Sequence, residues 1–295
     1  MFNYKRLNFT FLSFLILLAV VLVDIFQLQT QEFDSTSEII NRQNLDTFYI
    51  TAPRGEMFDT NGNKIVETIL EPHLFVNLRK ITDQNVSNYK QIIEYNFPEL
   101  DITEINDIFT SKDILKLVIN LNSVEYEIRN NLTNNYDVFE VIDLPVRKYI
   151  QGELFAHTIG YLGRPNQEEV SQYSNALKNN EVGKNGLERY YEEILSGVPG
   201  ELIFEGNEIV QSKLPVPGKD IFLTIDSMTQ SVVKDSLQQG IDLANKSFKT
   251  TNEIKRGAAV VLDVKTGNVL SMVSLPDFNP NKFIAGISDF EYRQL

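Results

Sequence analysis

The sequence contains no cysteine and no tryptophan, and only two of its 295 residues are histidine. The lack of cysteine excludes a disulfide scaffold and thiolate metal sites, but it leaves the compartment open, because bacterial periplasmic domains often have none. His73 and His157 lie far apart, and neither stands in a histidine and carboxylate pattern. We therefore expect no catalytic metal site and predict that both histidines are structural, hydrogen-bonded residues.

Basic residues are also scarce, since 27 Lys and Arg face 40 Asp and Glu and the formal net charge is -13. Binding to nucleic acid needs clustered Lys and Arg, and no basic stripe is present, so we exclude a nucleic-acid partner. The glycines stand singly, without the spacing of a dinucleotide or P-loop motif, and we predict no cofactor. With 42% hydrophobic residues, the chain can bury a core and is long enough for more than one domain.

A long apolar run, LNFTFLSFLILLAVVLV, occupies residues 7–23. As a helix it would span about 25 Å, and apolar residues as far as Leu28 extend it toward the thickness of a bilayer core. Lys5 and Arg6 precede it, which predicts a cytoplasmic N-terminus. No small-residue cleavage site follows, so an uncleaved anchor is favoured over a signal peptide or a buried helix. The predicted parts are a cytoplasmic stub (1–6), a transmembrane anchor (7–28) and a juxtamembrane stalk (29–46).

The apolar patterns of the remaining chain predict a mixed α+β fold. Asn61-Gly62 indicates a type I′ hairpin whose second strand is 64–69. Residues 201–205 and 208–212 form another predicted hairpin, and residues 258–262 and 269–273 a third, whose first strand should be covered on both faces because it does not alternate with polar residues. Further predicted elements are strands at 74–78 and 138–144, the latter ending at Pro145, and helices at 86–95, 105–119 and 123–132. The next helix should be capped by Asp226 or by Ser227, with Gln230 completing a capping box from Ser227.

Four separated segments share their motifs and their order with a known family. The motif residues are Arg54, Gly55, Asp59, Asn61 and Gly62 in the first segment; His157 and Gly160 in the second; Gly186, Glu188, Tyr191 and Gly197 in the third; and Asp263, Gly267, Pro280 and Asn281 in the fourth. Together these segments resemble the class B penicillin-binding proteins, and residues 283–288 are most similar to the elongation-type members. Thr60 departs from the family, in which arginine is common at this position.

The resemblance implies an α+β architecture with two parts after the anchor: a non-catalytic pedestal domain of the dimerisation type (47–217) and the truncated start of a penicillin-binding transpeptidase α/β domain (218–295). It implies a serine D,D-transpeptidase that cross-links peptidoglycan stem peptides and is acylated by β-lactams. The Ser-x-x-Lys nucleophile is expected beyond Leu295, so we assign no catalytic, cofactor or metal residue.

The resemblance also implies a location and partners. We expect a single-pass protein of the bacterial inner membrane whose bulk is periplasmic, working with a membrane-embedded glycan polymerase and other proteins of the elongation complex. Two alternatives stay open: a non-catalytic, membrane-anchored interaction module of that complex, and a fragment of a division-type class B protein.

Several charged or catalytic-looking residues are assigned no chemistry. Ser231 to Lys234 and Ser87 to Lys90 match Ser-x-x-Lys only as strings, and Lys265-Thr266-Gly267 falls in a predicted turn. The paired glutamates at 168–169 and 192–193 are typical of a solvated helix face. For Arg54 we expect a solvated side chain or a local ion pair.

Overall fold

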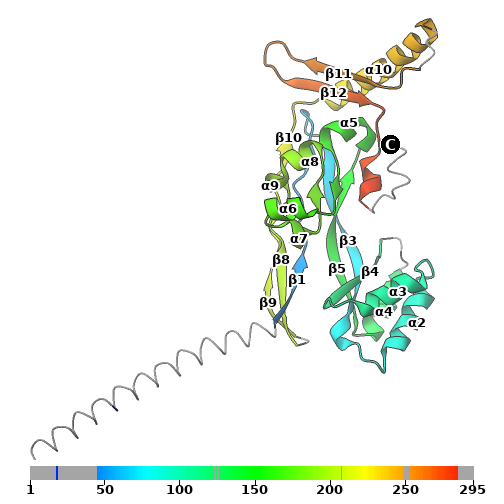
Figure 1. The fold of residues 1–295 in the computed structure, drawn as a ribbon, viewed down its shortest axis with the longest axis vertical. Coiled ribbons are helices and arrows are strands. Elements are labelled where there is room, and N and C mark those ends of the chain that lie inside the picture. The colour runs from blue at the N-terminus through cyan, green and yellow to red at the C-terminus, as the bar shows by residue number, and fades with distance from the viewer. Residues whose placement is uncertain are drawn as a thin grey trace, which may run out of the picture.

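A computed structural model describes Leu18 and residues 45–122, 124, 126–206, 208–248 and 253–284. The molecule is elongated, and two long antiparallel strands, β3 (Lys64–Asn77) and β5 (Phe139–Tyr149), run through its middle (Figure 1). The strands predicted at 64–69 and 74–78 are thus one strand. The strand predicted to end at Pro145, with residues 146–149 extended after it, is one continuous strand. Among the described residues β5 pairs with β3 alone, and an edge strand tolerates a missing N–H group.

The lower lobe in Figure 1 packs helices against the far ends of β3 and β5. Its elements are η1 (Leu78–Lys80), α2 (Val86–Asn96), α3 (Ile102–Thr110), β4 (Leu115–Asn120) and α4 (Tyr126–Asn135). The helix predicted at 105–119 is wrong after Thr110, since residues 115–120 form a strand that pairs with β3. The helical spacing of the apolar residues gave no sign that an edge of β3 is free to pair with this segment. The β-branched Val118 and Ile119 favour a strand once that edge is available.

Beside the lower lobe lies a three-stranded antiparallel sheet in the order β1-β8-β9. Its strands are β1 (Leu45–Ile50), β8 (Gly200–Glu205) and β9 (Glu208–Lys213). The predicted hairpin of β8 and β9 is confirmed. Every residue of β9 is exposed, so this strand is a solvent-facing edge.

Short elements pack together in the middle of the molecule, around the start of β3 and the end of β5. They are β2 (Met57–Phe58), α5 (Gly152–Ile159), β6 (Leu162–Gly163), α6 (Gln167–Gln172), α7 (Ala176–Asn179), β7 (Val182–Gly183), α8 (Gly186–Tyr190), α9 (Glu192–Leu195) and β10 (Ile221–Phe222). Met57, Val66, Tyr149, Phe155 and Leu195 are the centre of their buried core. Strand β10, which leads into the last part of the chain, pairs in parallel with β2.

The loop between β2 and β3 is not the predicted type I′ turn. That turn needs positive φ at both central residues, but only Gly62 has one, at 79°. Instead, the Asp59 amide donates to the Asn63 carbonyl, and the Asp59 carboxylate accepts from the amides of Asn61 and Asn63. A longer loop organised by one carboxylate takes the place of the two-residue turn.

The last part consists of α10 (Ser227–Phe248), β11 (Gly257–Leu262), β12 (Val269–Leu275) and η2 (Pro280–Phe283). The predicted β11–β12 hairpin is confirmed. Its predicted burial on both faces is wrong: helix α10 packs on one face, near Gly257, while Val260 and Leu262 are more than half exposed on the other. Of the two expected caps, Asp226 is the one used, since it accepts from the Thr229 amide; the capping box from Ser227 does not form, because Gln230 turns inward.

Candidate functional site

Arg54 is almost fully buried, and its guanidinium group binds two glutamates from distant helices. Its Nη2 atom lies 2.9 Å from Glu188 Oε2 and 2.8 Å from Glu192 Oε2, and its Nη1 atom donates to Glu192 Oε1 at 3.1 Å. Such multidentate, charge-assisted bonds fix the geometry of the guanidinium as well as its charge. The expected ion pair of Arg54 is thus present, but it is buried and joins residues distant in the chain, so a solvated or local charge is not what the structure has.

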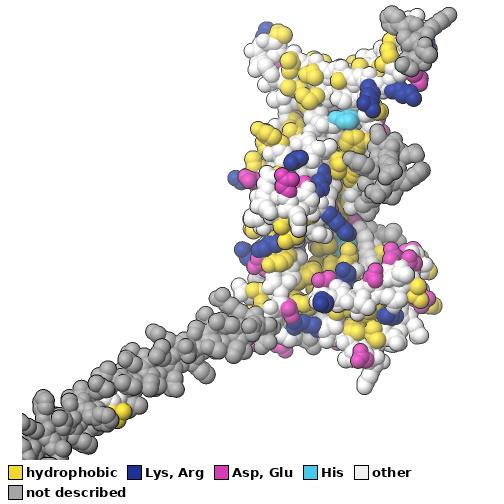
Figure 2. All heavy atoms as spheres, in the orientation of Figure 1, with side chains coloured by type: hydrophobic (Ala, Val, Ile, Leu, Met, Phe, Trp, Pro, Cys, Tyr) yellow, Lys and Arg dark blue, Asp and Glu magenta, His cyan; other side chains and the backbone are white. Residues whose placement is uncertain are grey.

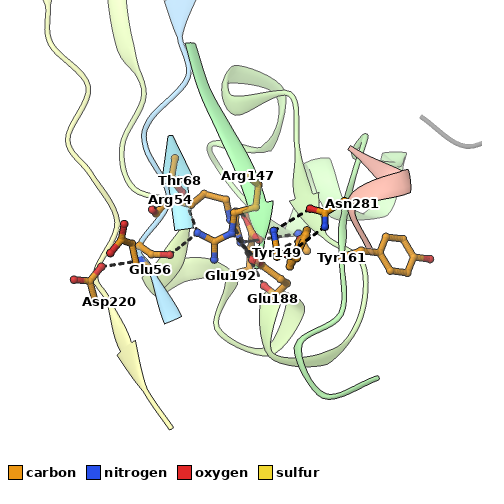
Figure 3. A network of polar contacts seen from close by, with 12 residues as sticks. Arg54, Glu56, Thr68, Arg147, Tyr149, Tyr161, Glu188, Glu192, Asp220 and Asn281 are labelled. Atoms are coloured by element: carbon orange, nitrogen blue, oxygen red, sulfur yellow. Dashed lines mark hydrogen bonds and ion pairs between the residues drawn. The ribbon is translucent and has the colours of Figure 1, made fainter. Parts of the chain in front are cut away.

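Arg147, from β5, approaches the same glutamate from the other side. Its Nε atom donates to Glu188 Oε1 at 2.8 Å, and its Nη1 atom donates to the Gly55 carbonyl at 2.7 Å and to Thr68 Oγ1 at 3.0 Å. Glu188 is completely buried between the two arginines (Figure 3). We call Arg54, Arg147, Glu188 and Glu192 the charge network. Two positive and two negative charges balance in it, as buried ions require.

The charge network favours the ionised forms of Glu188 and Arg54. Burial alone would raise the pKa of Glu188, but the charges of Arg147 and Arg54 lower it below its ordinary value. Burial would likewise lower the pKa of Arg54, but Glu188 and Glu192 raise it. Tyr149 borders the network, and burial followed by the charge of Glu188 raises the pKa of its hydroxyl, so that it stays neutral. The network is therefore a permanent structural feature near neutral pH.

The backbone beside Arg54 is hydrogen bonded to two other segments. The Gly55 amide donates to the Leu195 carbonyl, the Gly218 amide donates to the Pro53 carbonyl, and the Ile221 amide donates to the Glu56 carbonyl, each at 2.9 Å. A Cβ atom on Gly55 would lie 1.9 Å from the Lys219 carbonyl oxygen, so this position requires glycine. Residues 53–58 are thus held between helix α9 and the linker that leads to α10.

Three sets of contacts fasten the last part of the chain to the middle; we call these contacts the junction. Asn281 bonds the backbone of Tyr149. The Gln230 side chain is fully buried, donates to the carbonyls of Leu154 and Met272, and accepts from the Ser271 hydroxyl and the Met272 amide.

The third set lies at the start of α10, where Ser227 Oγ donates to Asp59 and Asn61 donates to Asp226. Asp59 is buried, which by itself raises the pKa of its carboxyl, but hydrogen bonds from Asn63 and Ser227 lower it to about 2. The Asp59 carboxylate therefore organises its own loop and also holds the next helix.

The structure brings some of the motif residues to these two places. Arg54, Gly55 and Glu188 lie in or beside the charge network, and Asp59, Asn61, Pro280 and Asn281 at the junction. His157 Nε2 lies 2.8 Å from the Pro276 carbonyl oxygen. Tyr191 packs against the buried core that contains Met57 and Tyr149. Gly160, Gly186 and Gly197 have positive φ at tight turns. Asp263 and Gly267 lie apart from the others, in the β11–β12 turn.

Sequence reasoning missed several residues of the site. Glu192 and Glu169 were assigned to a solvated face, yet Glu192 is 3% exposed and Glu169, which pairs with Lys184, is 6% exposed; only their neighbours face solvent. Arg147 was not singled out, and Gln230 was expected only as part of a capping box. Arg147 stands among other charged residues of its strand, with Lys148 beside it, so no local pattern marked it as buried.

The catalytic-looking strings do not form a site within the described residues. Lys234 forms an ion pair with Asp277, not with Ser231, so the lysine is not placed to activate that hydroxyl. Lys265-Thr266-Gly267 closes the β11–β12 turn, where Asp263 accepts from the Lys265 amide. Among residues whose placement is described, no cluster of acidic and histidine side chains is arranged to hold a metal ion.

The model of the Penicillin-binding Protein dimerisation domain matches residues 49–223, more than half of the chain. The chain belongs to this family of penicillin-binding proteins. The resemblance predicted from the four motif segments is thereby confirmed. The matched range holds the charge network and ends at the linker before α10.

Relatives and solved structures agree with this assignment. The chain is 30% identical to peptidoglycan D,D-transpeptidase MrdA of Haemophilus influenzae, covering 99% of this chain and 45% of that protein, and 28% identical to MrdA of Escherichia coli, covering 99% and 46%. Its fold is similar to that of penicillin-binding protein PBP2 in a complex with MreC from Helicobacter pylori, with a TM-score of 0.65 and 21% identity over 85% of this chain and 46% of that one. The chain spans about half the length of the curated relatives it matches.

The membrane anchor predicted at residues 7–28 lies outside the described residues, except for Leu18. Within the described part, no helix has both the length and the apolar character needed to cross a bilayer. Residues 285–288, which suggested an elongation-type member, also lie outside it.

Proposed function

We propose that this chain is the membrane-anchored N-terminal part of an elongation-type peptidoglycan D,D-transpeptidase, and that its described body is a pedestal for the transpeptidase domain. The observation that carries the proposal is the junction. Tyr149 contacts the charge network through its hydroxyl and Asn281 through its backbone, so one residue joins the pedestal core to the start of the next domain.

The chemistry of the proposed reaction is acyl transfer. A serine attacks the penultimate D-alanine carbonyl of a stem peptide and releases D-alanine, and the acyl group then passes to an amine of a neighbouring peptide. That reaction needs an activated nucleophile and an oxyanion hole. We assign neither to a described residue.

The proposed location is the bacterial inner membrane, with residues 1–6 cytoplasmic, residues 7–28 spanning the bilayer and the bulk in the periplasm. The proposed partners are a membrane-embedded glycan polymerase and scaffold proteins of the elongation complex. Support for a protein partner is that a structural neighbour was solved as a complex of PBP2 with MreC. On the face shown in Figure 2, cationic and anionic side chains are interspersed, which suits a protein surface better than nucleic acid.

The experiment is to express the chain alone in its source bacterium beside the intact chromosomal gene. We expect it to compete for elongation partners and make cells shorter and rounder, while a fluorescent β-lactam leaves it unlabelled. Labelling of the chain would show that it carries a reactive nucleophile of its own and would contradict this assignment. Unchanged cell shape, with the chain in the membrane at levels above the native protein, would contradict the role in elongation.

A further inference from the structure

Arg147 has one nitrogen that contacts no partner. Its side chain is 3% exposed, and its Nε and Nη1 atoms donate to Glu188, Gly55 and Thr68. The buried Nη2 atom, in contrast, donates to no atom among the residues that the structure describes. Buried polar groups nearly always have a hydrogen-bond partner, and one without a partner destabilises the folded state.

A small cavity lies next to this arginine. Its volume is about 10 Å³, which is room for about one water molecule. Its polar lining consists of Thr51, Arg54, Thr68, Arg147, Asn179 and Glu181. A site of this size and polarity is suited to a single water rather than to a larger ligand.

Most of the polar groups in the lining are already in use. Asn179 accepts from the Ala52 amide and donates to the Ser196 carbonyl, and the Thr68 hydroxyl donates to the Arg54 carbonyl and accepts from Arg147. The Thr51 hydroxyl makes one long bond of 3.5 Å to the Asn179 carbonyl. The Glu181 carboxylate makes no hydrogen bond to any described residue. The lining therefore holds one free donor, Arg147 Nη2, and two groups with free acceptor oxygens, the Glu181 carboxylate and the Thr51 hydroxyl.

We propose that this cavity binds one structural water, which accepts a hydrogen bond from Arg147 Nη2 and donates one to the Glu181 carboxylate. The Thr51 hydroxyl is in reach as a third partner, and two to four polar partners are typical of buried waters. Through this water Glu181 acts as a positioning residue for Arg147 although the two are not directly bonded.

An anion is excluded by the local charge. Glu188 and Glu192 already balance the two arginines, and Glu181 adds a further carboxyl at the cavity. Burial and then the charge of Glu188 raise the pKa of the Glu181 carboxyl, despite the opposing effect of Arg54, which indicates that this environment does not favour added negative charge. A neutral water satisfies Arg147 Nη2 without adding charge.

The direct test is a crystal structure of the full chain, grown in sodium bromide and measured at the bromine absorption edge. We expect a spherical density peak within hydrogen-bond distance of Arg147 Nη2 and Glu181, with no anomalous signal. An anomalous peak at this position would identify an anion and overturn the proposal. An empty cavity, or a direct bond from Arg147 Nη2 to a protein atom, would overturn it as well.

Two substitutions at Glu181 add a test in solution. Glu181→Gln keeps an acceptor for the water, and we expect its thermal midpoint to stay within roughly 1 °C of that of the parent chain. Glu181→Leu removes the acceptor, and we expect a midpoint lower by roughly 3–6 °C and loss of the density peak. The matched control is Glu193→Leu at an exposed position. Equal midpoints for the two leucine variants would overturn the role of Glu181. These readouts do not involve transpeptidation, so their failure would leave the proposed function untouched.

Discussion

Asn281 bonds both backbone groups of Tyr149, although 132 residues separate the two. The Tyr149 amide donates to Asn281 Oδ1 at 2.9 Å, and Asn281 Nδ2 donates to the Tyr149 carbonyl at 2.9 Å. The hydroxyl of the same tyrosine lies 3.4 Å from Glu188 Oε1. Tyr149 therefore links the charge network on one side to η2 on the other, and the pedestal and the segment after it are held as one body.

Replacing Asn281 with alanine should release η2 from β5. Two hydrogen bonds are lost, each contributing about 0.5–1.5 kcal/mol, so hydrogen exchange in residues 276–284 should become about tenfold faster or more while the lower lobe is unaffected. Lys282→Ala is the control, because Lys282 is the exposed neighbour. Equal exchange in the two variants would show that Asn281 does not hold the segment.

Arg54→Ala should be the most destabilising single change in the charge network. It leaves Glu188 and Glu192 buried with one fewer cation, and breaking a buried ion pair costs about 3–5 kcal/mol of unfolding free energy. Arg54→Lys should lose less, because lysine keeps the charge but not the forked geometry. Urea unfolding measures both. The control is Lys64→Ala, which removes an exposed pair with Glu56 and should change the unfolding free energy far less. A loss no larger for Arg54→Ala than for this control would refute the structural role of the network.

Gln230→Glu should loosen α10 from α5 and β12 with almost no change in side-chain size. A carboxylate has no N–H group for the carbonyls of Leu154 and Met272, so we expect about 2–3 kcal/mol of destabilisation from the unpaired buried groups. Thermal unfolding and limited proteolysis of the last part of the chain report it. Gln239→Glu, on the exposed side of the same helix, should behave like the parent chain. If both variants resist protease equally, Gln230 does not secure the helix.

Asp59 should contribute to the unfolding free energy in a way that is lost in acid. Its pKa is lowered in the folded protein to about 2, from about 3.9 in an unfolded chain, so the folded state is favoured when Asp59 is ionised. This contribution is fully present above about pH 4 and is lost as the pH falls toward 2. It amounts to roughly 2.5 kcal/mol.

The measurement for Asp59 is the difference in unfolding free energy between the parent chain and Asp59→Asn. We expect roughly 2 kcal/mol near pH 7, shrinking toward zero near pH 2. Other carboxylates lose stability in acid in both proteins, so the difference isolates Asp59. Asp83→Asn, at an exposed site, should show no such trend. A difference that is constant over this pH range would contradict the assigned cause.

Local sequence patterns correctly predicted the helices and strands that are determined by residues close together in the chain. The β8–β9 and β11–β12 hairpins follow from turn residues between apolar runs, and α2 from its periodicity. Patterns failed where a distant partner decided the outcome. Residues 115–120 became a strand because β3 supplies an edge. Strand β5 passed through Pro145 because no described strand pairs with its outer side.

The site was predictable only in part, for the same reason. Arg54 and Glu188 were found through the family motif, but their bond spans 134 residues, and no local pattern indicates it. Glu192 resembled its exposed neighbour Glu193 in sequence, and only the packing of α9 against Arg54 separates them. Gln230 fitted a capping box and instead bonds strand β12, which lies 42 residues further along the chain.

The most direct test of the central claim is hydrogen exchange at the junction in the Arg54→Ala variant of the full chain, compared with Lys64→Ala. If the charge network positions the start of the next domain, exchange should rise in residues 218–226 and 276–284 as well as around residues 182–200. The claim is contradicted if exchange rises only around residues 182–200 while both junction segments stay as protected as in the control.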